Sequence, residues 1–190
     1  RNVARQAGRV RLFELGRVFA KAEGEGNPVP VETTRIAAAV CGDAEALQWG
    51  MPARKVDFHD LKGDLEALAA ASGAQLTFVP SQRPFGHPAR SADVLRDGVC
   101  IGWIGQVHPR LAKALDIDAD VIGFELDLAP LVARALPRAG ELSRFPSVRR
   151  DLAFLVPEDV SWEALRATIA GSVGELLREL VLFDRYVGQG

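Results

Sequence analysis

Short hydrophobic runs, rich in residues that favour β-structure, recur along the chain up to about residue 128. Turn residues such as Asp97-Gly98 bound the runs, and most gaps between them are short enough for hairpins. The predicted strands occupy residues 10–19, 35–41, 76–79, 92–95, 99–107 and 121–128. Consecutive runs of this kind predict an antiparallel sheet with few helices, in which the first two strands form a hairpin with a long connection.

Two segments have helical rather than alternating spacing. In the longer one, apolar residues recur every three or four positions, at Phe58, Leu61, Leu65 and Leu68. Asp57 precedes them as an N-cap and Gly73 follows as a stop, so the helix is predicted between these two residues. Gly63 lies inside it, either because a neighbour packs too closely for a Cβ atom or because glycine is simply tolerated there. A shorter helix is predicted over residues 109–115, with Pro109 in its first turn.

A domain boundary is predicted between Pro137 and Pro146, where Pro, Gly and Arg interrupt the hydrophobic pattern. Beyond it, residues 152–156 and 176–183 are predicted strands, and a helix capped by Ser161 lies between them. Strand, helix, strand is half of a ferredoxin-like split βαβ domain. A third strand separates the first two in that fold. We therefore expect their inner edges to be open, and the segment to be markedly mobile unless other residues complete the sheet.

Composition indicates an ordinary soluble globular protein, with 48% hydrophobic and 25% charged residues. A net charge of −2 gives no overall attraction to nucleic acid or membranes, so a polyanionic partner would need a local basic patch. No apolar stretch approaches the roughly 18 residues of a membrane span, and we expect neither a signal peptide nor an anchor. The chain lacks an initiator Met and starts within a pattern, so we interpret it as a piece of a longer protein.

Neither the cysteines nor the histidines form a motif for metal or redox chemistry. Cys41 and Cys100 lie far apart, without CxxC spacing and each within an apolar run. Both are therefore predicted to be buried free thiols in a reducing compartment. The histidines, His59, His87 and His108, are isolated, and no metal-ligand spacing occurs. We predict no metal site.

No combination of residues predicts a catalytic centre. Asp57 and Asp60 could be paired carboxylates, but they lie in the first turn of the predicted helix, where acidic residues serve as caps and are stabilised by the helix dipole. Gly102 and Gly105 do not open a helix, as a phosphate-binding loop would. A small hydrolase using His87 and a nearby aspartate would require a pocket that brings the two within hydrogen-bond reach. We predict that the chain has no catalytic residues of its own.

Two small groups of residues beyond the boundary could contact nucleic acid. Arg149 and Arg150 follow Arg144 in a basic cluster that could meet phosphates, or could form an ordinary solvated face. Asp184 and Tyr186 lie two residues apart at the end of the last predicted strand, so both side chains would point to the same side. A hydrogen-bond acceptor beside an exposed aromatic ring can bind and stack an unpaired base, although such residues also occur on plain surfaces.

Several motifs occur along the chain in a distinctive order. They are RVRLFELGRVF, VDFHDLKGDLEAL, HPARSA with IGWIGQVHP, FELDL, SRFPSVRRDLAFLV and LFDRY. Together they closely resemble the C-terminal third of the β subunit of bacterial phenylalanyl-tRNA synthetases, over essentially the whole chain. The resemblance implies an α+β fold in which residues 1–136 form a noncatalytic module with the antiparallel sheet and flanking helices of class II synthetases. Residues 143–190 would be the first half of a ferredoxin-fold anticodon-binding domain, a truncated βαβ unit.

The resemblance also implies site residues and partners. In that family the Asp and Tyr of the LFDxY motif approach the tRNA anticodon, and they match Asp184 and Tyr186. Arg149 and Arg150 match positions near a strand start, where a phosphate contact is our own inference. No cofactor is implied for this part of the protein; the whole enzyme uses ATP and Mg²⁺ to attach phenylalanine to tRNA. Its partners would be tRNA and the catalytic α subunit, in a cytoplasmic (αβ)₂ heterotetramer without membrane attachment.

The alternative interpretation is a stand-alone protein-interaction module that reuses the same folds and has no tRNA role. Sequence upstream of Arg1 and downstream of Gly190 in the parent gene would distinguish the two. A module that serves as scaffold for another subunit should also expose an apolar face. We expect such a patch, larger than a few hundred Å², on the first domain.

Overall fold

The computed structural model describes residues 7–21, 29–134 and 146–188. The chain forms two compact units, Arg1–Arg138 and Ala139–Gly190, which are described separately. Within the described residues, no helix is long and apolar enough to cross a membrane. The predicted boundary between Pro137 and Pro146 lies almost entirely outside the described residues.

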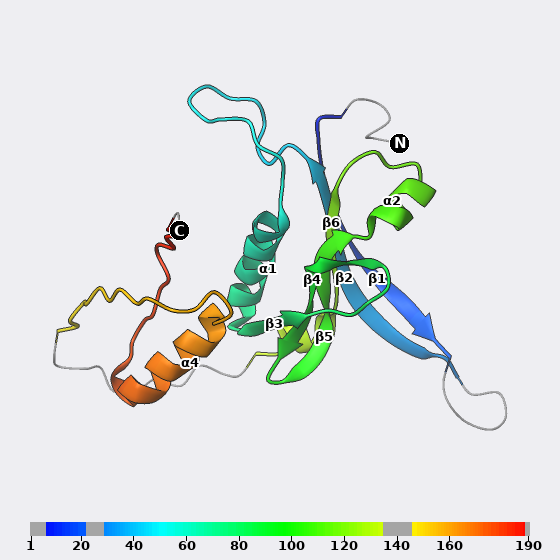
Figure 1. The fold of residues 1–190 in the computed structure, drawn as a ribbon. Coiled ribbons are helices and arrows are strands. Elements are labelled where there is room, and N and C mark those ends of the chain that lie inside the picture. Colours follow the sequence, from blue (N-terminus) through cyan, green and yellow to red (C-terminus); the bar gives the residue numbers. More distant parts are fainter. Residues whose placement is uncertain (1–6, 22–28, 135–145, 189–190) are drawn as a thin grey trace. The chain divides into compact units, whose positions relative to one another are not determined.

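The first unit is built on a six-stranded sheet in the order β1-β2-β6-β5-β4-β3 (Figure 1). Every neighbouring pair is antiparallel. The strands are β1 (Arg9–Ala20), β2 (Val31–Gly42), β3 (Leu76–Pro80), β4 (Gly86–Arg96), β5 (Val99–Val107) and β6 (Val121–Asp127). The prediction of an α+β fold with an antiparallel sheet and few helices is confirmed. The main difference is that β4 begins at Gly86, well before the predicted residue 92.

The predicted hairpin of the first two strands is confirmed, and it extends beyond the sheet. β1 pairs with β2 along its whole length, from Arg9 opposite Gly42 to Ala20 opposite Val31. β2 in turn pairs with β6 only over 35–41. The far part of the hairpin therefore projects past the other strands (Figure 1).

In the described part of this unit, three helices accompany the sheet: α1 (Phe58–Ser72), α2 (Pro109–Ala114) and α3 (Leu128–Val132). The predicted caps of α1 are confirmed. The Asp57 carboxylate accepts hydrogen bonds from the N–H groups of His59 (2.8 Å) and Asp60 (3.2 Å), and the Asp60 carboxylate accepts from the Asp57 N–H (2.8 Å). Gly73 ends the helix in the left-handed region, with φ of 74°. A Cβ atom on Gly63 would meet nothing within 4 Å, so glycine is simply tolerated there.

The core lies between α1 and one face of the sheet. Leu61, Leu65 and Ala69 of α1 belong to one cluster with buried residues of β4, β5 and β6. The sheet residues at its centre are Val94, Ile104, Phe124 and Leu126. Side chains alternate between the two faces of a strand, so the neighbouring sheet positions lie on the face opposite α1.

The two cysteines lie in different environments. Cys41 is buried, as predicted, and burial raises the pKa of its thiol. The prediction of burial is wrong for Cys100, whose side chain is exposed. It lies near the start of β5, directly after the Asp97-Gly98 turn, where the register with β4 is irregular. Its apolar neighbours in sequence do not cover it there.

The described residues of the second unit, 146–188, contain one α-helix, α4 (Trp162–Val173), followed by a 3₁₀ turn, η2 (Gly174–Leu176). The predicted helix start is confirmed, because the Ser161 hydroxyl accepts a hydrogen bond from the Ala164 N–H (3.2 Å). None of the described residues of this unit is buried. The apolar face of α4 is therefore only partly covered, at Trp162, Leu165 and Ile169.

The two strands predicted in the second unit are wrong. Residues 152–156 and 176–183 contain no strand pairing; apart from η2, the described segments before and after α4 have no regular secondary structure. The physical reason lies in the ferredoxin-like order, in which a third strand pairs with both of them. The first two strands are not neighbours in that order, so neither satisfies the other's backbone groups. Local preference for extended structure therefore does not produce a sheet here.

Candidate functional site

The face of the sheet opposite α1 carries a row of polar and aromatic side chains. Asp93, Trp103, Glu125 and Ala37 lie side by side on β4, β5, β6 and β2. The ring of Phe85, from the loop before β4, meets Trp103 edge to face, with centroids 4.9 Å apart. This is the face on which a ligand of the sheet would have to bind, because α1 occupies the other.

Three carboxylates on this face, those of Glu125, Asp127 and Asp93, are held by arginines. Arg35 donates from Nε to Asp127 Oδ1 (2.9 Å) and from Nη1 to Glu125 Oε1 (3.0 Å). The hydrogen bond that Arg35 donates to Glu125, with help from the one to Asp127, raises the pKa of Arg35.

A second arginine on the same face binds the aspartate of the row. Arg83 Nε donates to Asp93 Oδ1 at 2.7 Å, and the Ser81 hydroxyl donates to the same oxygen at 3.0 Å. The Asp93 hydrogen bond raises the pKa of Arg83. Carboxylates engaged in this way are poorly placed to accept a proton from a substrate.

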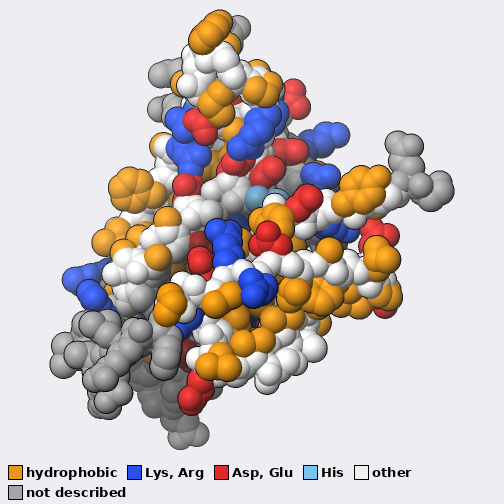
Figure 2. Space-filling model, turned by 90° about the vertical axis from the view of Figure 1, so that its left-hand side faces the viewer, with side chains coloured by type: hydrophobic (Ala, Val, Ile, Leu, Met, Phe, Trp, Pro, Cys, Tyr) orange, Lys and Arg blue, Asp and Glu red, His pale blue; other side chains and the backbone are white. Residues whose placement is uncertain are grey.

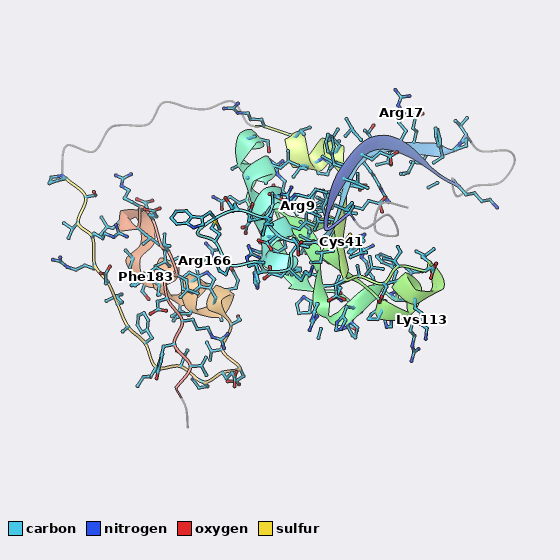
Figure 3. All side chains as sticks on the ribbon, turned by 90° about the horizontal axis from the view of Figure 1, so that it is seen from above. Arg9, Arg17, Cys41, Lys113, Arg166 and Phe183 are labelled. Atoms are coloured by element: carbon cyan, nitrogen blue, oxygen red, sulfur yellow. The ribbon has the colours of Figure 1, made fainter. Side chains whose placement is uncertain are left out.

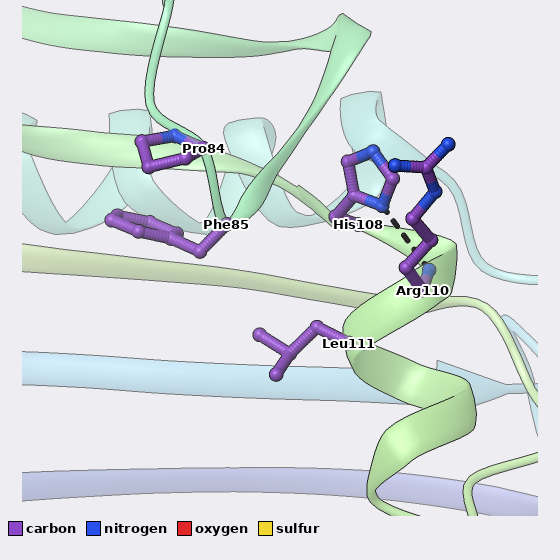
Figure 4. Close-up of a pocket in the computed structure, with 5 residues that line it drawn as sticks. All are labelled: Pro84, Phe85, His108, Arg110 and Leu111. Carbon is purple, nitrogen blue, oxygen red and sulfur yellow. Dashed lines mark hydrogen bonds between the residues drawn. The ribbon is translucent and has the colours of Figure 1, made fainter.

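A hollow of about 350 Å³ adjoins this region, lined by Pro84, Phe85, His108, Arg110 and Leu111 (Figure 4). His108 is the titratable group one would first consider as a base there. Its Nδ1 instead accepts a hydrogen bond from the Arg110 N–H (3.1 Å) and caps the first turn of α2. The hollow therefore combines a cation and an aromatic ring without an available nucleophile–base pair.

The other sequence candidates for chemistry are not brought together. His87 Nδ1 accepts from the Ala89 N–H (3.1 Å), and within the described residues no hydrogen bond joins His87 to an aspartate. The hydrolase interpretation requires a hydrogen bond between His87 and an aspartate, and the described residues do not provide it. Over residues 7–21, 29–134 and 146–188, no three His, Cys, Asp or Glu side chains are grouped to hold a metal ion.

The predicted nucleic-acid residues all lie on the second unit and are exposed. Asp184 and Tyr186 follow η2 in an extended segment, and 87% of Tyr186 is accessible. Arg149 and Arg150 lie in the segment before α4, where Arg150 Nη1 donates to the Arg149 carbonyl (3.3 Å). No hydrogen bond or ion pair joins these two pairs of residues in the part of the unit that the structure describes. Arg144 lies outside the described residues.

Neighbours of these residues form surface contacts that the sequence pattern did not indicate. Arg185 Nη2 lies 3.7 Å from Glu158 Oε1 and links the last segment to the turn before α4. Phe183, on the same segment, is 70% exposed (Figure 3). The last segment thus presents two aromatic rings, Phe183 and Tyr186, to solvent.

The first unit also exposes large apolar side chains that the sequence pattern assigned to secondary structure or left aside. On β1, Phe13 is 81% and Leu15 58% exposed. In the loop between β2 and α1, Leu47 and Trp49 are almost completely accessible. Hydrophobic side chains gather over that loop at the top of Figure 2. The sequence signal for both exposed groups would have been large apolar residues on a strand or loop that has too few neighbouring residues to bury them.

Comparison with known proteins defines the class to which the two units belong. Residues 1–128 match the profile of the phenylalanyl tRNA synthetase beta chain CLM domain, and residues 143–190 match the ferredoxin-fold anticodon binding domain. The first match is a domain of an aminoacyl-tRNA synthetase, and the second is a domain that binds anticodons. The chain belongs to the phenylalanyl-tRNA synthetase beta chain family, as its motifs had indicated.

Individual relatives agree with the profiles. The chain is 77% identical to the phenylalanine–tRNA ligase beta subunit of Xanthomonas euvesicatoria pv. vesicatoria and 78% identical to that of Xanthomonas campestris pv. campestris. Identity to the Xylella fastidiosa (strain Temecula1) protein of the same name is 65%. Each match covers 100% of this chain but 24% of the relative. The chain thus spans about a quarter of the length of the curated relatives that it matches.

Proposed function

We propose that the chain is the C-terminal part of a phenylalanine–tRNA ligase β subunit, with two tasks. The first unit, 1–136, is a noncatalytic class II synthetase-like module that serves as a scaffold for the catalytic α subunit. The second, 143–190, belongs to the domain that binds the tRNA anticodon. The observation that carries this proposal is the occurrence of both domain matches, in order, on one chain.

The whole enzyme would join phenylalanine to tRNA in the cytoplasm, as an (αβ)₂ heterotetramer that uses ATP and Mg²⁺. We assign neither cofactor to this chain, because Glu125, Asp127 and Asp93, on the sheet face opposite α1, are bound by Arg35 and Arg83. Binding of Mg²⁺ there would first require breaking these ion pairs. The chemistry therefore belongs to the α subunit, and the part played by the β subunit is to hold its partners.

Contact with tRNA would use the exposed residues of the second unit. Tyr186 can stack on an anticodon base, and the Asp184 carboxylate can accept hydrogen bonds from base amino groups. Arg149 and Arg150 can contact phosphates of the tRNA backbone, which attract cations whatever the nucleotide sequence. Their exposure supports this assignment, because none of the four side chains is used to hold a core.

The proposal is tested by separating the subunits. The complete β subunit is co-expressed with an α subunit from the same organism, and the complex is assayed for attachment of phenylalanine to tRNA. We expect the two to co-purify and to act together, whereas the chain of 190 residues alone should form no phenylalanyl-adenylate. Adenylate formation by the purified chain, or full aminoacylation by α without β, would contradict the proposal.

A further inference from the structure

We draw no further inference here: the strongest candidate, the open hollow beside α2 that Phe85, His108 and Arg110 line, carries nothing, because nothing in the structure shows which ligand, neighbouring segment or partner fills it.

Discussion

Arg54 and Asp60 face each other through two hydrogen bonds, Nη1 to Oδ2 and Nη2 to Oδ1, each 2.6 Å long. The same Asp60 carboxylate caps α1 by accepting the Asp57 N–H. The hydrogen bond from Arg54 is the main cause that lowers the pKa of Asp60 to about 2. One side chain thus closes the helix start and anchors the loop before it.

This ion pair should make the stability of the first unit depend on pH in the acidic range. A carboxyl group whose pKa is lower in the folded state stabilises that state above its unfolded pKa, near 3.8, and the contribution is lost as the pH falls through its folded pKa. We therefore expect the melting temperature to fall between about pH 4 and pH 2. Arg54→Met should flatten this part of the pH profile while leaving the cap in place. An unchanged profile in that variant would contradict the assignment.

The core position of Leu65 predicts a large loss of stability on truncation. Leu65 is completely buried between α1 and the sheet. Leu65→Ala should reduce the free energy of unfolding by about 2–5 kcal/mol, because it removes a buried side chain and leaves a cavity. Leu68→Ala, at a position 39% exposed on the same helix, is the control and should cost much less. Urea titration of both variants measures the difference, and similar losses would place Leu65 outside the core.

Thiol reactivity should separate the two cysteines. Cys100 is exposed, whereas Cys41 is buried and burial raises the pKa of its thiol. A thiolate is the reactive form, so we expect one thiol to react quickly with a disulfide reagent in the native chain and both to react after unfolding. Cys100→Ser should abolish the fast reaction and Cys41→Ser should leave it. Fast labelling of the Cys100→Ser variant would be inconsistent with the burial of Cys41.

The proposed stacking of Tyr186 on an anticodon base predicts a selective loss of tRNA binding when the ring is removed. Within the complete enzyme, Tyr186→Ala should weaken tRNA binding by roughly 1–3 kcal/mol, the usual contribution of a base on an aromatic ring. Tyr186→Phe keeps the ring and should retain most of the affinity. Formation of the adenylate, measured in the same preparation, should be unaffected. Equal losses in binding and adenylate formation would mean that Tyr186 supports the fold instead.

The unpaired segments of the second unit predict fast hydrogen exchange. Residues 176–183 make no strand pairing, whereas β5 lies in the interior of the sheet between β4 and β6. In a monomer ending at Gly190, amides of 177–183 should exchange far faster than those of β5. Equal protection in the two segments would show that 176–183 forms a paired strand after all.

The parts of the fold that local chemistry determines could be read from the sequence. Asp57, Ser161 and Gly73 mark helix ends because caps act within a few residues, and each lies where expected. The order of strands in the sheet could not be predicted in this way. β2 and β6 are neighbours although some 80 residues separate Val40 from Ile122, its partner in register, and no local signal specifies that pairing.

In the candidate site, too, local features could be predicted from the sequence and long-range contacts could not. Motifs identified Asp184, Tyr186, Arg149 and Arg150 as exposed candidates, but strand propensity alone placed the first two at the end of a strand that does not form. Propensity describes what a segment can adopt, and pairing also requires a neighbour. The arginine pairs on the sheet, such as Arg35 with Glu125, connect residues far apart in sequence and could not be foreseen.

Arg35 binds both Glu125 and Asp127, so the charge balance of this part of the sheet face opposite α1 depends on one residue. Replacing Arg35 leaves two neighbouring carboxylates to repel each other, and replacing one carboxylate leaves the arginine bound to the other. A single change at Arg35 would therefore leave a pair of free carboxylates on this face, the kind of group that can serve as a base.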